Sequence, residues 1–218
     1  MRKKWPKTES DLAEVVVNWL QDLRWEIYQE VQFYAYGRIA DIVAVQNNLV
    51  WIVETKKTMT LAVIEQAEYW KGNAHYVSIA VPYANWTNKG RSFAYTVCKK
   101  FGVGAFIVSE PTTYTPIYVI EKQKPQFNRY AKTERVFETL SEEHKTFAKA
   151  GNPDNKRWTP FQKTSKAVVE EVCKNPGLTL KELIDRVDTH YSSTSTAKTC
   201  IAKYIRDGII KGLRTEQD

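Results

Sequence analysis

Three charged residues interrupt two apolar stretches at positions where their side chains can meet. Asp41 lies in the first stretch, Glu54 and Lys56 end the second, and an Asn-Asn pair at 47–48 separates the two. Because asparagine tolerates the positive φ of a tight turn, this pair predicts a two-residue β-hairpin. The pairing then places Asp41 opposite Glu54, with Lys56 next to Glu54 on the same face.

Two neighbouring carboxylates in an apolar sheet resist ionising together unless a cation is present. Carboxylate oxygens are hard ligands that suit Mg²⁺ or Mn²⁺, and we expect one of these ions as cofactor. Such an ion stabilises charge on a phosphodiester and activates water, while the Lys56 ammonium orients that water or neutralises the transition state. The alternative is a plain salt bridge from Lys56 to Glu54 or Asp41. The apolar surroundings favour a functional site, because buried charge is destabilising without a purpose.

Periodicity indicates the elements that position these residues. Apolar residues from Leu12 to Leu23 recur at helical spacing, residues 26–37 read as a strand, and residues 60–73 read as a helix before a strand at 74–82. This order implies a parallel crossover. Further along we expect a helix at 87–102 capped by Thr87 or Asn88 and ended by Gly102, strands at 104–109 and 115–122, and a helix near 131–150.

The pattern changes after a stretch rich in Pro, Asn and Gly at 150–163, which we interpret as a linker. The remainder predicts three short helices and two short extended pieces around Gly212; the helices are expected at 165–177, 179–187 and 195–208. Thr179 and Glu182 have capping-box spacing. We therefore predict an α/β domain at 1–149 and a small winged helix-turn-helix domain at 164–218.

With "AD" at 40–41 and "ETK" at 54–56, in a hairpin after a first helix, the chain resembles the PD-(D/E)xK nuclease superfamily over roughly residues 9–110. Ala40 stands where the name of the motif has proline. The resemblance implies a restriction-endonuclease-like fold, a mixed sheet flanked by helices.

The same resemblance implies that Asp41 and Glu54 bind the metal, that the Thr55 carbonyl adds a ligand and that Lys56 is catalytic. Many members also carry a first-helix glutamate that assists the metal. Glu14 resembles it by position, but the helical wheel places Glu14 opposite the apolar stripe and Glu9 nearer its edge. The alternative interpretation is that Glu14 simply lies on the solvent-exposed face of the helix.

Gln66, with Tyr69 one turn on, is similar to residues of RecB-like and resolvase-like members of the superfamily. There the glutamine and tyrosine are implied to position the lysine or to contact DNA, and we count Gln66 among the catalytic candidates. Tyr69 and the adjacent Trp70 have an alternative interpretation as helix core.

The formal net charge of +7 favours an acidic partner such as nucleic acid. Between Asp188 and Asp207 there is no acidic residue, whereas lysines and hydroxyl side chains begin the third helix of the second domain. We expect that helix and the wing to contact duplex DNA through Ser195, Thr196, Lys198, Thr199, Lys203, Lys211 and Arg214.

The sequence as a whole predicts a cytoplasmic, metal-dependent DNA endonuclease. No apolar run reaches the length of a membrane helix, and Cys98, Cys173 and Cys200 are too scattered for a zinc site or a disulfide framework. The order of parts resembles that of transposon-end nucleases and some phage or defence nucleases. Cutting both strands usually needs two active sites, so a homodimer or a partner subunit is considered. The alternatives are a non-catalytic DNA-binding regulator and a junction resolvase.

Overall fold

The computed structural model describes residues 6, 8–33, 37–83, 89–109, 116–151 and 157–214. They form two compact units, of which the first reaches Trp158 and the second begins at Thr159. This boundary falls inside the stretch 150–163 that composition marks as a linker, and the end of that stretch already belongs to a helix. A membrane crossing would require a helix longer and more apolar than any in the described part of the chain.

The first unit combines helices and strands, as its sequence predicts. Its elements in chain order are α1 (Glu9–Asp22), β1 (Glu26–Gln32), β2 (Ile39–Gln46), β3 (Leu49–Thr55), α2 (Leu61–Tyr69) with a 3₁₀ turn at Trp70–Gly72, β4 (Tyr76–Pro82), α3 (Lys89–Phe101), β5 (Gly104–Val108), β6 (Val119–Gln123), α4 (Glu134–Thr139) and α5 (Glu143–Thr146).

The strands of the described residues form one mixed sheet of six strands in the order β1-β2-β3-β4-β5-β6. Strands β1, β2 and β3 pair antiparallel, β3, β4 and β5 pair parallel, and β6 returns antiparallel to β5. The parallel pairs arise because α2 and α3 each carry the chain back to the same end of the sheet. The predicted α/β class with a mixed sheet flanked by helices is confirmed.

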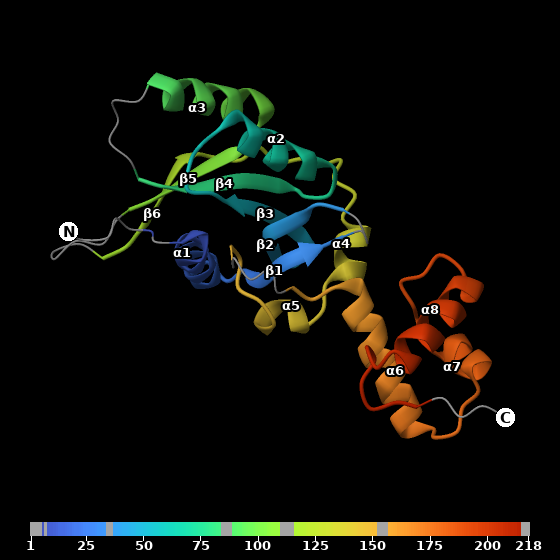
Figure 1. Ribbon diagram of the computed structural model, residues 1–218. Helices are drawn as coiled ribbons and strands as arrows, with labels where there is room; N and C mark the ends of the chain where they lie inside the picture. Colours follow the sequence, from blue (N-terminus) through green and yellow to red (C-terminus); the bar gives the residue numbers. More distant parts are fainter. Residues whose placement is uncertain are drawn as a thin grey trace. The chain divides into compact units, whose positions relative to one another are not determined.

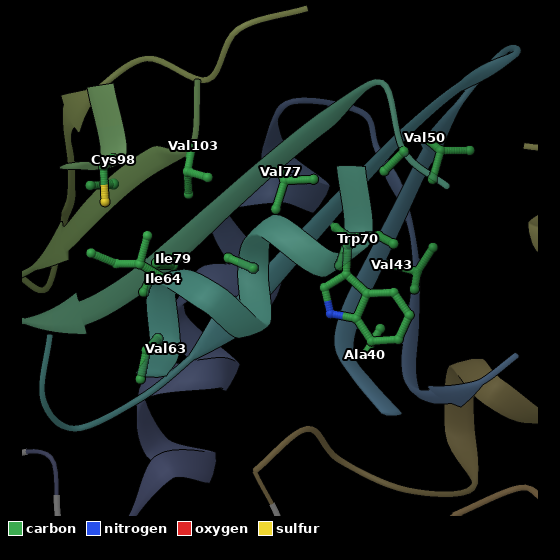
Figure 2. Close-up of a cluster of buried hydrophobic side chains, with 14 of the residues drawn as sticks. Ala40, Val43, Val50, Val63, Ile64, Trp70, Val77, Ile79, Cys98 and Val103 are labelled. Carbon is green, nitrogen blue, oxygen red and sulfur yellow. The ribbon is translucent and has the colours of Figure 1, made fainter. Parts of the chain in front are cut away.

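Helices cover both faces of this sheet, with α1 on one side and α2 and α3 on the other (Figure 1). Strand β3 shows the alternation that produces two cores. Val53 packs in the cluster with Leu12 of α1, whereas Ile52 packs in the cluster with Ile64 of α2 and Cys98 of α3. Figure 2 shows part of the second cluster, around Trp70 and the strand residues beneath α2.

The hairpin between β2 and β3 turns at Asn47 and Asn48, and Asn47 has a φ of 54°. Its pairing begins at Gln46 with Leu49 and continues to Ile42 with Val53. The predicted register is therefore confirmed up to the pair that precedes Asp41 and Glu54.

One predicted helix, near 131–150, is divided in the structure. Helices α4 and α5 are separated by residues 140–142, of which Leu140 is extended with a ψ of 141°. Gly102 ends α3 with a φ of 68°, as predicted. The predicted caps Thr87 and Asn88 lie outside the described residues.

The second unit consists, in its described residues, of α6 (Pro160–Lys174), α7 (Leu180–Arg186) and α8 (Thr194–Arg206). Thr179 and Glu182 form the predicted capping box at the start of α7. The three helices enclose a separate small core in which Val168, Leu183 and Ile201 are buried.

The predicted wing is not formed as a hairpin in the described residues. After α8, residues 207–214 contain turns and bends and no strand. Gly208 and Gly212 both have positive φ, so each reverses the chain where a strand would have to continue. Ile210 instead anchors this segment in the small core.

We expect Asn47→Val to lower the midpoint of thermal unfolding by about 3 °C or more, because a β-branched residue is strained at positive φ. Asn47→Gly, which accepts that backbone conformation, should leave the midpoint nearly unchanged. Thermal unfolding followed by circular dichroism measures both variants. Equal midpoints for the two variants would contradict the turn geometry.

Candidate functional site

Asp41 is held in place by the residues that end β3. It is 7% exposed, and its Oδ2 accepts hydrogen bonds from the Thr55 backbone N–H at 2.8 Å, the Thr55 hydroxyl at 3.0 Å and Lys56 Nζ at 3.1 Å. No donor among the described residues reaches Oδ1. The carboxylate is thus oriented through one oxygen, and the other can accept a ligand.

Glu54 is fully buried, at 0% exposure, in the core beneath α2. Its Oε1 accepts a hydrogen bond of 2.6 Å from the indole N–H of Trp70, while its Oε2 has no partner in the described part of the chain. Burial, together with the negative charge of Asp41, raises the pKa of Glu54 to about 8. An unpaired buried carboxylate oxygen is unfavourable by about 1–3 kcal/mol or more, so it calls for an explanation.

Lys56 completes the group as its cation. Its Nζ lies 3.1 Å from Asp41 Oδ2 and 3.8 Å from Glu9 Oε2. Burial acts to lower the pKa of Lys56, but the charges of Asp41, Glu54 and Glu9 outweigh it and raise that pKa above its usual value. Lys56 therefore stays protonated at neutral pH and supplies positive charge and N–H donors rather than a base.

The first helix contributes Glu9 to this site. Besides its contact with Lys56, Glu9 accepts a hydrogen bond of 3.4 Å from the Lys57 backbone N–H. Glu14 instead pairs with Lys149 at 3.4 Å, and both of those side chains are more than half exposed. Glu14 lies on the solvent side of α1, where the helical wheel places it. The described contacts bring Glu9, and not Glu14, to the catalytic candidates.

Trp70 is a site residue that its sequence context assigns only to the core. It packs among the apolar residues beneath α2, including Ala40 and Val43 (Figure 2), yet its N–H donates to Glu54. The signal in the sequence is weak, because a core tryptophan and a hydrogen-bonding one follow the same apolar spacing. A buried indole N–H usually has a partner, and Glu54 is the polar residue buried nearby.

Gln66 lies half-buried on α2, and no hydrogen bond of the described residues connects it to the carboxylates. Its catalytic role stays a prediction. Tyr69 is 42% exposed, and the guanidinium of Arg38 stacks on its ring at 4.7 Å, while Arg38 also pairs with Glu65 at 3.0 Å. Tyr69 therefore lies at the protein surface and not in the core.

Glu30 of β1 is a further acidic residue near Asp41 that sequence reasoning misses. Strand β1 pairs with β2 through Gln29 with Ile42 and Val31 with Ala40, so Glu30 occupies the position opposite Asp41. Burial and the charge of Asp41 raise the pKa of Glu30 to about 7. Its backbone has a φ of 53°, which no pattern in the sequence predicts.

The two central carboxylates fit a small divalent cation. Asp41 offers Oδ1, Glu54 offers the unpartnered Oε2, and oxygen ligands of this kind suit Mg²⁺ or Mn²⁺. Mg²⁺ keeps several waters and needs only one or two carboxylates from the protein. Among the described residues, no group of three or more His, Cys, Asp or Glu side chains is arranged to hold a metal ion. The Thr55 carbonyl as a ligand stays a prediction.

The exposed face of α8 carries most of the predicted DNA-contacting residues. Ser195, Thr196, Thr199 and Lys203 are exposed, whereas Lys198 is half-buried. Steps of 100° place Arg206, also exposed, on the same face as Ser195 and Lys203. Lys211 and Arg214 are exposed in the turns that follow. Arg206 was not among the predicted contacts, although its spacing from Thr199 and Lys203 is the helical one.

The start of α8 has its own cap. Ser193 Oγ accepts a hydrogen bond of 3.2 Å from the Thr196 backbone N–H and lies 2.8 Å from the Thr196 hydroxyl. The Thr199 hydroxyl donates back to the Ser195 carbonyl at 3.1 Å. These hydrogen bonds join only residues of α8 and its cap. They leave the exposed face of α8 open to solvent.

Comparison with known proteins gives no relative: no family model matches the chain, and neither a curated protein nor a solved structure matches it.

We expect Glu54→Gln to stabilise the metal-free protein above pH 8. The raised pKa of Glu54 means that its contribution to stability is complete below pH 4.5 and is lost as the pH rises through about 8. Glutamine keeps an acceptor for Trp70 and cannot ionise, so the thermal midpoint at pH 8.5 in EDTA should rise by about 3 °C or more. At pH 5 the two proteins should differ little. A midpoint that falls at both pH values would contradict the assignment.

Proposed function

We propose that this protein is a divalent-metal-dependent endonuclease that hydrolyses phosphodiester bonds of DNA. The observation that carries the proposal is the fully buried Glu54, with an unpartnered oxygen, next to Asp41 and the protonated Lys56. A plain salt bridge accounts for Lys56 and Asp41, but it leaves Glu54 unexplained. A cation between the two carboxylates would compensate both.

Asp41 and Glu54 would hold the ion, which supplies Lewis-acid stabilisation of the phosphodiester and a more acidic water. The remaining steps belong to the chain itself. Thr55 fixes the Asp41 carboxylate through two hydrogen bonds, and Trp70 fixes Glu54 through one. Lys56 places its ammonium beside Asp41, where it can donate to a phosphate oxygen or to the attacking water as negative charge develops.

The arrangement of the first unit supports a restriction-endonuclease-like core as part of the proposal. An antiparallel hairpin carries the charged residues, follows a first helix, and precedes a helix and a parallel strand. This is the order that the PD-(D/E)xK resemblance implies.

We further propose that the second unit binds duplex DNA through α8. Its exposed face presents hydroxyl groups with Lys203 and Arg206, and no acidic residue lies between Ser193 and Arg206. Such a face suits phosphate and base-edge contacts in a major groove. The three helices of the second unit support a helix-turn-helix interpretation, while the described residues after α8 contain no strands for a wing.

The decisive experiment incubates the protein with supercoiled plasmid in Mg²⁺, Mn²⁺ or EDTA. We expect metal-dependent conversion to nicked or linear product. Asp41→Asn, Glu54→Gln and Lys56→Met should each slow it by about 100-fold or more, because each removes charge stabilisation from the transition state.

Lys57→Met is the matched control for Lys56→Met. Lys57 is the exposed neighbour of Lys56 in the sequence, and the substitution keeps its backbone N–H, which donates to Glu9. Its variant should cut at nearly the wild-type rate. Cleavage that persists in EDTA, or equal rates for both methionine variants, would contradict the proposal. DNA binding without cleavage would favour the regulator, and preferential cutting of a four-way junction over plain duplex would favour a resolvase.

Binding of duplex DNA tests α8 separately. We expect the double variant Lys203→Ala, Arg206→Ala to weaken binding by about tenfold or more and to reduce its salt dependence, since lost phosphate contacts release fewer counterions. Lys174→Ala, an exposed lysine on α6, serves as control and should bind nearly as wild type. Fluorescence anisotropy at several salt concentrations measures both. Equal losses for the two proteins would show only a general charge effect.

A further inference from the structure

Glu30 is held in an unfavourable backbone conformation at the site. A φ of 53° is rare for a residue other than glycine, asparagine or aspartate, and it is unfavourable by about 1–2 kcal/mol. Such strain persists only where surrounding contacts impose it, and an observed outlier next to a site is a reason to ask for a role. The conformation occurs at the position opposite Asp41.

The side chains of Glu30 and its neighbour Gln29 are held by the segment that closes the first unit. The Gly151 N–H donates to Glu30 Oε1 at 2.8 Å, and the Ala150 N–H donates to Gln29 Oε1 at 2.9 Å. Gly151 itself has a φ of 69°, and a Cβ there would lie 2.7 Å from the Glu9 carbonyl carbon. The segment therefore fits closely between β1 and the start of α1, and it fixes the Glu30 carboxylate through Oε1.

The second oxygen of Glu30 remains available, since no donor within the described residues occupies Oε2. Lys56 Nζ lies beside two of the four acidic side chains of this group, 3.1 Å from Asp41 and 3.8 Å from Glu9. The buried Oε2 of Glu54 has no hydrogen-bond partner in the described residues, so it can accept a cation.

We propose that Glu30 is a third carboxylate of the metal site, a positioning residue that strengthens binding of the divalent ion at Asp41 and Glu54 without ligating it directly. The inference rests on the proposed function. Direct ligation is not required, because Mg²⁺ and Mn²⁺ retain waters that a carboxylate outside the ligand set can accept hydrogen bonds from. The tie to Gly151 then serves to aim the charge, and the strained backbone is retained for that purpose.

Two neighbouring substitutions separate the effect of the Glu30 charge from that of the hydrogen bonds to Ala150 and Gly151. Glu30→Gln removes the charge and keeps an acceptor for the Gly151 N–H. Gln29→Ala removes the adjacent tie to Ala150 and leaves all carboxylates in place. Isothermal titration of metal-free, full-length protein with Mn²⁺ gives the affinity, and thermal unfolding in EDTA gives the stability of each variant.

We expect Glu30→Gln to weaken Mn²⁺ binding by about tenfold, the loss typical of residues that support metal ligands from outside, with no decrease of its thermal midpoint in EDTA. Gln29→Ala should lower that midpoint and keep the Mn²⁺ affinity within about twofold of wild type. This crossed pattern cannot come from a merely structural role of Glu30.

Two results would overturn the inference and leave the proposed function intact. They are wild-type Mn²⁺ affinity in Glu30→Gln, and an equal loss of affinity in both variants with lowered midpoints in both. If the wild-type protein itself binds no Mn²⁺, the metal-dependent function fails, and the inference fails with it.

Discussion

The fold of the first unit places a carboxylate where the hydrophobic effect alone would place an aliphatic side chain. Glu54 occupies an inward position of β3, two residues after Ile52 in the same core, and it is fully buried beside a second acid. Burial and the charge of Asp41 oppose its ionisation, so its pKa rises to about 8. The protein keeps this destabilising group, and a bound divalent cation is the simplest compensation.

The surrounding elements each fix one part of this arrangement. The Asn47 turn sets a register that reaches Ile42 with Val53, the pair next to Asp41 and Glu54, and a slip by one residue would turn every side chain to the other face. The end of β3 orients Asp41 through Thr55, and the turn after α2 orients Glu54 through Trp70. The site thus depends on the backbone geometry of β2, β3 and α2. The carboxylates of Asp41 and Glu54 are oriented before any ligand binds.

The sequence predicts the hairpin and its register well, because asparagine at a turn and strict alternation are local signals. It predicts less where a residue has two compatible interpretations. Trp70 follows core spacing whether or not its N–H is used, and Glu30, with its positive φ, accepts a hydrogen bond from Gly151, a partner distant in the chain. The helical wheel did contain the signal that favours Glu9 over Glu14. The predicted strands of the wing are not found in the described residues, because short apolar segments around Gly212 can also pack in the core as turns.

The central claim is that Asp41 and Glu54 together bind a divalent cation. Crystals soaked in Mn²⁺ and measured at an energy with anomalous manganese signal test this most directly. The account predicts an anomalous peak in contact with a carboxylate oxygen of each residue, with Glu54 Oε2 as one ligand. The absence of an anomalous peak at this position after a soak in saturating Mn²⁺, with Lys56 paired to both carboxylates instead, would contradict the claim.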